Sequence, residues 1–323
     1  MRPAQHRFPD FFIVGSPKTG TTSLYQMLRA HPQIYMPALK EPRFLAGDMR
    51  PVPKHASGPD ESGYPRTMEE YLALFEEATP QQRVGEASTF YLWSRTAAER
   101  IADLQPDARI IAILREPASL LRSMHLMLLG WGVEGERDLR KALSLEAARR
   151  EGRHVPRHSP RPQLLLYSDH VRYVEQLGRF RARFPSEQIL VLIYDDFRRD
   201  NEGTVRRVLG FLDVDAEAPV ALAQSNVTQR ATRSPQGKYL MQSLMGGQGR
   251  LARSAKATIK ALTSQRLRYR AGKQVRDLVR TELPPADEQL MLELRRRYKP
   301  EVQAVSDHLE RDLVSLWGYD RLD

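Results

Sequence analysis

Short apolar runs alternate with helical patterns along the chain and predict a mixed α/β protein. The strand-like runs fall at residues 11–14, 83–87, 109–114 and 188–194. Apolar residues at helical spacing predict helices at 94–104, 117–129, 169–184 and 201–212. Strands that alternate with helices in this way predict a central parallel sheet with helices on both faces.

Residues 11–24 carry the most informative local pattern. Four apolar residues, 11–14, precede a loop with Gly and Pro, and a helical pattern begins at Thr21. Where a strand, a tight loop and a helix N-terminus meet, unpaired backbone N–H groups and the helix dipole attract an anion. Lys18 adds a full positive charge to this loop. Hydroxyl donors are supplied by Thr19, Thr21, Thr22 and Ser23. The segment therefore predicts a P-loop-like phosphate site.

The loop differs from the Walker A loop of nucleotide-dependent kinases. Gly15 and Gly20 have the GxxxxG spacing, but two threonines follow, and the lysine, Lys18, lies inside the turn. The apolar strand 109–114 ends in Arg115, where a magnesium-binding acid would be needed. Both differences argue against a magnesium nucleotide, although a P-loop-type kinase stays an alternative.

Three chemistry-bearing residues closely follow predicted strand ends: Lys18, Glu86 and Arg115. In parallel sheets, ligands gather beyond the carboxyl ends of the strands. We therefore expect these three side chains to converge on one site.

The 323 residues and 41% hydrophobic content suffice for a sizeable core, and the pattern predicts one domain over the whole chain. We expect a core at about 8–240, a basic helical segment at 246–281 and C-terminal helices at 284–320 packed on it. Residues 47–67 and 152–163 are rich in Pro, Gly or basic residues and predict surface loops.

The net charge of +10 has two interpretations. It indicates an anionic ligand or an acidic polymer, or it reflects an arginine-rich composition with solvated charges. A non-enzymatic binder of anionic polymers therefore stays a second alternative. The absence of cysteine excludes disulfides and thiolate metal sites. No apolar run approaches a membrane span and the N-terminus lacks a signal-peptide core, so a cytoplasmic protein is expected.

Together these motifs resemble the sulfotransferases that use 3′-phosphoadenosine 5′-phosphosulfate (PAPS), above all the bacterial members and the heparan-sulfate-type domains. Residues 17–24 resemble their 5′-phosphosulfate loop. A strand ending in Arg115, with Ser123 eight residues on, resembles their 3′-phosphate element. The sequence Lys40-Glu41-Pro42-Arg43-Phe44 resembles a third family element, and blocks at 85–91 and 192–197 also match. The likeness extends from about residue 8 to 239.

The resemblance implies PAPS as donor, adenosine 3′,5′-bisphosphate as product and no required metal. Lys18, with Gly20 and the loop hydroxyls, would hold the phosphosulfate, and Lys18 would also act in catalysis by stabilising the leaving group. Arg115 with Ser123 would grip the 3′-phosphate. A family loop that closes over this phosphate has its counterpart at 233–239, where Lys238 is the better candidate and Arg233 the weaker.

Glu41 is the implied catalytic base. Glu86 and His125 are further candidates for the base or for substrate contacts, and Lys40 is a candidate substrate contact. His125 fits equally well as a packed residue of an apolar helix. The implied acceptor is a hydroxyl, or less favourably an amine, of a glycan, glycolipid or secondary metabolite. No nucleic-acid partner is expected, and the sequence leaves the oligomeric state open.

Two aromatic residues, Trp93 and Tyr194, are possible stacking partners for the adenine ring and equally good core residues.

Overall fold

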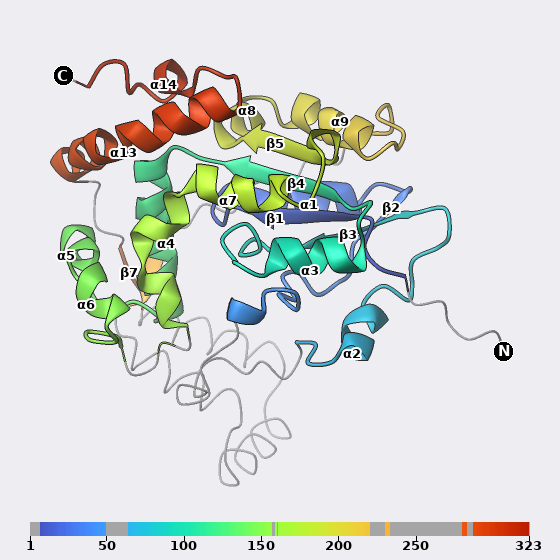
Figure 1. Cartoon of the computed structure of the whole chain (residues 1–323), viewed down its shortest axis with the longest axis horizontal. Coiled ribbons are helices and arrows are strands. Elements are labelled where there is room, and N and C mark those ends of the chain that lie inside the picture. Colours follow the sequence, from blue (N-terminus) through green and yellow to red (C-terminus); the bar gives the residue numbers. More distant parts are fainter. Residues whose placement is uncertain are drawn as a thin grey trace, which may run out of the picture.

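Figure 1 shows a computed structural model of the chain, in which helices pack on both faces of a central sheet. The structure describes residues 7–49, 64–156, 159, 161–219, 230–232, 280–282 and 287–322. The main sheet has five parallel strands in the order β2-β3-β1-β4-β5. Their bounds are β1 Phe11–Gly15, β2 Ile34–Tyr35, β3 Arg83–Ala87, β4 Arg109–Leu114 and β5 Ile189–Ile193. The predicted α/β fold with a central parallel sheet is confirmed.

Nine α-helices precede the separate strand pair in the described part of the chain. Their bounds are α1 Thr21–Arg29, α2 Met68–Ala73, α3 Ala97–Leu104, α4 Pro117–Trp131, α5 Leu139–Ser144, α6 Glu146–Arg150, α7 Tyr173–Arg181, α8 Tyr194–Arg199 and α9 Asn201–Phe211. Short 3₁₀ turns are η1 Gly47–Met49, η3 Pro162–Leu165, η4 Tyr167–Val171 and η5 Ser186–Gln188. A separate antiparallel pair is formed by β6 Arg230–Thr232 and β7 Arg280–Glu282.

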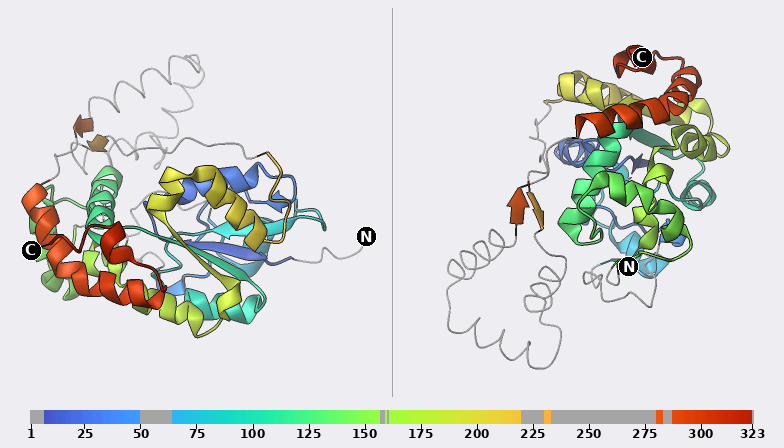
Figure 2. Two further views of the ribbon diagram at one scale, coloured as in Figure 1. Left: turned by 90° about the horizontal axis from the view of Figure 1, so that it is seen from above. Right: turned by 90° about the vertical axis from the view of Figure 1, so that its left-hand side faces the viewer.

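Alternate side chains of each strand enter two hydrophobic clusters. From β1, Phe11 and Ile13 pack with α1 and α9, which lie together on one face (Figure 2). Phe12 and Val14 pack on the other face, where α3, α4 and α7 contribute. A strand that is buried on both faces is apolar at every position. This burial explains why the strands appear as continuous apolar runs in the sequence.

Strand β1 lies in the middle of the sheet, between β3 and β4. After β1 the chain forms β2 and β3 on one side of this strand, and it then forms β4 and β5 on the other side. Such a reversal of strand order opens a crevice at the carboxyl ends of the strands. The loops that follow the neighbouring strands β1 and β4 lie at this end of the sheet.

The C-terminal helix α13 Glu288–His308 packs on α4 and α7, and α14 Leu313–Leu316 packs on α13. Buried residues at helical spacing face inward from α13, namely Leu290, Leu294, Tyr298, Val302 and Val305. Beyond α14, the Trp317 indole donates to Asp195 at 2.9 Å and the Tyr319 hydroxyl donates to Glu116 at 2.5 Å. These bonds tie the C-terminal segment to the residues that directly precede α4 and begin α8.

Several predicted elements differ from the structure in their bounds. The helix expected at 94 begins at Ala97, because the Ser94 hydroxyl donates to Asp48 and accepts from the Ala97 N–H in a turn. The helix expected at 169–184 is the 3₁₀ turn η4 followed by the shorter α7. Of the basic helical segment expected at 246–281, only Arg280 and Thr281 belong to the described residues, and they lie in strand β7.

Candidate functional site

The loop between β1 and α1 forms the candidate anion site. Gly20 ends the loop with a φ of 81°, which favours glycine, and a Cβ there would lie 2.9 Å from the Phe197 ring. No side chain caps α1, so the N–H groups of its first turn are open to a ligand. Lys18 is also left-handed, with a φ of 65°. The glycine in the sequence and the positive φ values of the backbone therefore both indicate a tight loop. This loop and the start of α1 present N–H donors.

The hydroxyls of this loop differ in their roles. Thr19 is buried and donates to the Ser16 carbonyl at 2.7 Å, which holds the turn together. Thr21 and Ser23 are also buried, whereas Thr22 is exposed at the start of α1. The buried Ser16 hydroxyl has no hydrogen-bond partner among the described residues. Sequence reasoning missed Ser16, whose only signal is its place beside Gly15.

Arg115 lies against this loop, although it follows a different strand. Its guanidinium donates to the Lys18 carbonyl at 2.9 Å and stacks 4.7 Å from the centre of the Tyr194 ring. Burial, and then the charge of Arg115, lower the pKa of the Lys18 ammonium. The predicted convergence of Lys18 and Arg115 is therefore confirmed, and the two cations repel each other.

Residues further along α4 and α8 complete this side of the site. Ser123 is half-buried on α4, eight residues after Arg115. Tyr194 lies under Arg115 and close to Gly20, so its ring supports the cation. Trp93 packs instead against His170, with ring centres 4.2 Å apart. The candidates Arg233 and Lys238 lie outside the described residues.

Residues 40–45, which we call the Glu41 loop, present a carboxylate between two cations. Lys40 Nζ lies 2.9 Å from Glu41 Oε1, and Arg43 contacts Glu41 Oε2 at 2.6 Å. The Glu41 side chain keeps 21% of its surface exposed. Burial raises the pKa of Glu41, but the charges and hydrogen bonds of Lys40 and Arg43 outweigh it and lower the pKa to about 2. Glu41 is thus ionised at neutral pH.

The expectation that Glu86 follows a strand end is wrong. Glu86 lies inside β3 and is fully buried. Its Oε2 accepts the hydroxyls of Tyr71 and Tyr91, each at 2.8 Å. Burial raises the pKa of Glu86 to about 7, against the lowering effect of hydroxyls from Ser88 and both tyrosines. With no exposed surface, Glu86 is not placed to contact a substrate.

His125 is also buried, on α4. Its Nδ1 lies 2.9 Å from the Tyr167 hydroxyl and its Nε2 lies 3.1 Å from the Arg137 carbonyl. Burial lowers the pKa of His125. Both ring nitrogens are thus engaged inside the protein, which favours the packed residue over the base.

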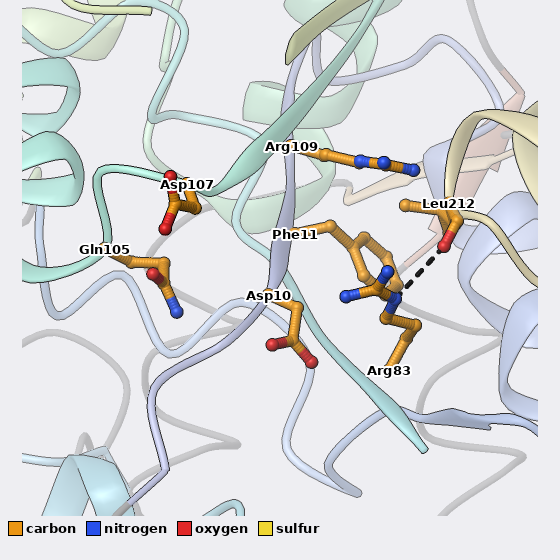
Figure 3. A pocket seen from close by; sticks show the side chains of 7 residues that line it. All are labelled: Asp10, Phe11, Arg83, Gln105, Asp107, Arg109 and Leu212. Atoms are coloured by element: carbon orange, nitrogen blue, oxygen red, sulfur yellow. Dashed lines mark hydrogen bonds between the residues drawn. The ribbon is translucent and has the colours of Figure 1, made fainter. Parts of the chain in front are cut away.

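A cavity of about 370 Å³ lies at the opposite edge of the sheet, where the strands begin (Figure 3). It is lined by Asp10, Phe11, Arg83, Gln105, Asp107, Arg109 and Leu212. Its arginines are engaged with the segment after α9: Arg83 donates to the Leu212 carbonyl at 3.2 Å, and Arg109 pairs with Asp213. We assign these contacts to structure, because they fix the end of α9 and lie far from the Lys18 loop.

In the described ranges, no group of three or more His, Asp or Glu residues is arranged to hold a metal ion. None of the helices described is both long and apolar enough to cross a membrane.

Comparison with known proteins identifies the family. The chain is 31% identical over 153 residues to carbohydrate sulfotransferase 15 of Homo sapiens. This match covers 36% of this chain and 27% of that protein. It is 27% identical over 252 residues to bifunctional heparan sulfate N-deacetylase/N-sulfotransferase 4 of Mus musculus, which covers 74% of this chain and 25% of that protein. The chain thus spans about a quarter of the length of these relatives.

Among solved structures, a sulfotransferase from Alicyclobacillus acidocaldarius is similar over 96% of this chain and 99% of that chain, with a TM-score of 0.66 and 26% identity. A model of the sulfotransferase family matches residues 9–218, well over half of the chain. Because this match covers most of the chain, the chain belongs to the sulfotransferase family.

Proposed function

We propose that the protein transfers the sulfuryl group of PAPS to a hydroxyl, or with less support an amine, of a glycan, glycolipid or secondary metabolite by in-line displacement. One observation carries the proposal: the 2.9 Å hydrogen bond from Arg115 to the Lys18 carbonyl. It places two cationic residues, which follow different strands, in one site. A nucleotide with separate 5′ and 3′ anionic groups requires such a pair.

The residues of the loop fit this donor. The uncapped N-terminus of α1 and the buried, unpartnered hydroxyl of Ser16 offer hydrogen bonds to an anion. Lys18 and Arg115 repel each other, as the lowered pKa of Lys18 indicates. An anion between them would remove this repulsion, so the site favours a ligand with at least one phosphate or sulfonate group.

We assign the 5′ end of the donor to Lys18, Thr19, Gly20, Thr21, Thr22 and Ser23. The 3′-phosphate is assigned to Arg115 and Ser123, and Lys238 is retained as a candidate outside the described residues. The donor supplies the activated sulfuryl group and departs as adenosine 3′,5′-bisphosphate. Lys18 and the loop N–H groups stabilise the negative charge that grows on the departing phosphate.

Glu41 accepts the proton of the acceptor hydroxyl in this proposal. It is ionised and partly exposed, whereas Glu86 and His125 are buried and engaged. However, a carboxylate with a pKa of about 2 is a weak base at neutral pH. The proposal therefore requires Lys40 or Arg43 to turn away from Glu41 toward bound sulfonate or acceptor, which raises the pKa of Glu41.

A transfer assay tests the proposal. The full chain is incubated with PAPS and EDTA, with heparan sulfate, a glycolipid or a phenol as acceptor, and release of adenosine 3′,5′-bisphosphate is measured by chromatography. We expect release that depends on one of these acceptors and needs no added metal. A parallel reaction contains Mg-ATP in place of PAPS and no EDTA. Hydrolysis of Mg-ATP or transfer from it, with none from PAPS, would favour the kinase alternative instead.

A further inference from the structure

We propose that residues 86–91, which we call the support segment, position Glu41 by fixing the Glu41 loop in a strained conformation. The inference rests on the proposed role of Glu41 as the base and extends it to residues that do not touch a substrate. Glu86 and Tyr91 act in it as positioning residues. It also gives the buried acid Glu86, which the proposed mechanism does not use, a function.

The Glu41 loop is held along its backbone at every second residue. The Glu41 N–H donates to the Ala87 carbonyl at 2.9 Å, and the Arg43 N–H donates to the Ser88 hydroxyl at 2.9 Å. The Leu45 N–H donates to the Tyr91 hydroxyl at 3.1 Å. Three successive anchors therefore come from one short stretch of chain that begins at the last residue of β3.

These anchors oppose an unfavourable backbone. Glu41 has a φ of 60° and Arg43 a φ of 56°, both in the left-handed region that residues with a Cβ seldom adopt. Such conformations persist only where the surroundings impose them. Without the anchors, we expect the loop to relax and the carboxylate of Glu41 to lose its direction.

The support segment also contacts the carboxylate side chain itself. The Thr89 hydroxyl donates to Glu41 Oε1 at 3.3 Å. The guanidinium of Arg43, which contacts the other carboxylate oxygen, lies 4.9 Å from the centre of the Phe90 ring. Both oxygens of Glu41 are thus oriented by groups that the segment provides or supports.

The Tyr91 anchor is directional because its hydroxyl has a single proton. That proton goes to Glu86 Oε2 at 2.8 Å, so the oxygen of the hydroxyl is left to accept the Leu45 N–H. Glu86 also accepts the Tyr71 hydroxyl, and the Tyr71 ring stacks on Phe44 at 4.8 Å. A buried carboxylate therefore orients two tyrosines that hold adjacent residues of the Glu41 loop.

The test removes the anchor without changing the shape of the core. In Tyr91→Phe, we expect the amides of residues 41, 43 and 45 to exchange hydrogen at least tenfold faster, as measured by mass spectrometry on the full chain. With PAPS and the panel acceptor that gives the highest wild-type rate, kcat should fall about 10- to 100-fold. The KM for PAPS and the affinity for adenosine 3′,5′-bisphosphate should stay within twofold.

Tyr167→Phe is the matched control. Tyr167 is a buried tyrosine that also donates to a buried glutamate, Glu134, at 3.0 Å, but it does not contact the Glu41 loop. We expect this variant to lose stability while kcat and the exchange at residues 41–45 remain those of the wild type. A fall in kcat of the same size in both variants would overturn the proposal, because it would reflect general loosening.

A second pair of variants covers the case in which Tyr91→Phe does not fold. Thr89→Val removes the hydroxyl that donates to Glu41, whereas Thr89→Ser keeps a hydroxyl at this position. We expect a lower kcat in the valine variant and recovery in the serine variant, again with an unchanged KM for PAPS. Unchanged kcat in Tyr91→Phe or Thr89→Val overturns the positioning role. Full activity in Glu41→Gln overturns the proposed role of Glu41 as the base. The failure of the inference and the failure of the proposed function therefore give different results.

Discussion

Replacing Glu41 by Gln is expected to lower kcat by a factor of about 10²–10⁴, the usual contribution of a general base. The amide has nearly the same shape but cannot take up a proton. It also leaves Lys40 and Arg43 without their shared carboxylate, so both cations lose partners at 2.9 and 2.6 Å. Because the Lys18 loop is a separate element, binding of adenosine 3′,5′-bisphosphate should not change by more than about twofold.

Glu136→Gln is a suitable control for this variant. Like Glu41, the Glu136 side chain is 21% exposed and pairs with a lysine, Lys141, at 2.7 Å. It contributes nothing to the Glu41 loop, so its loss should leave kcat unchanged. The measurement is the steady-state rate of the wild type, Glu41→Gln and Glu136→Gln with PAPS. A Glu41→Gln enzyme that keeps more than about a tenth of the wild-type kcat would exclude Glu41 as the base.

Glu86 should make the protein less stable as the pH rises. The pKa of Glu86 is raised from 4.5 to about 7 in the folded protein. Between pH 4.5 and pH 7 the Glu86 carboxyl loses its proton in the unfolded chain but keeps it in the folded chain. The free energy of unfolding therefore falls as the pH rises through this range. Below pH 4.5 the effect is absent, and above pH 7 it is complete, at about 3 kcal/mol, because each pKa unit corresponds to about 1.4 kcal/mol.

Urea unfolding of the wild type and Glu86→Gln at pH 5 and pH 8 measures this effect. The glutamine keeps an oxygen for the hydroxyls of Tyr71 and Tyr91 but has no proton to lose. We expect the stability of the wild type relative to the variant to fall by roughly 2–3 kcal/mol between the two pH values. Equal differences at both pH values would show that Glu86 has an ordinary pKa.

Local signals in the sequence suffice to predict the sheet and the tight loop after β1. The strands are apolar at successive positions because both faces of a parallel sheet are covered, and Gly20 lies where the chain needs a positive φ. The convergence of Lys18 and Arg115 also follows from the fold class, since strand ends in a parallel sheet share one edge. Strand β2, only two residues long, is too short to have a periodicity.

The places of Glu86 and His125 depend on residues distant in the chain. Glu86 is bound by Tyr71, fifteen residues earlier, and His125 is bound by Tyr167, forty-two residues later. An acidic or basic residue in a sequence gives no sign that its partner will bury it. The left-handed backbone of the Glu41 loop has no sequence signal either, because neither Glu41 nor Arg43 is a glycine or asparagine.

The most direct measurement is a calorimetric titration of the full chain, in EDTA, with adenosine 3′,5′-bisphosphate and with adenosine 5′-monophosphate. Hydrogen bonds to charged groups contribute about 1.5–3 kcal/mol each, so the 3′-phosphate should tighten binding to the wild type about 10- to 100-fold. Arg115→Met should bind both nucleotides with nearly equal affinity. Equal affinities in the wild type, or a preference that persists in Arg115→Met, would contradict a site built from Lys18 and Arg115 for a nucleotide with two anionic groups.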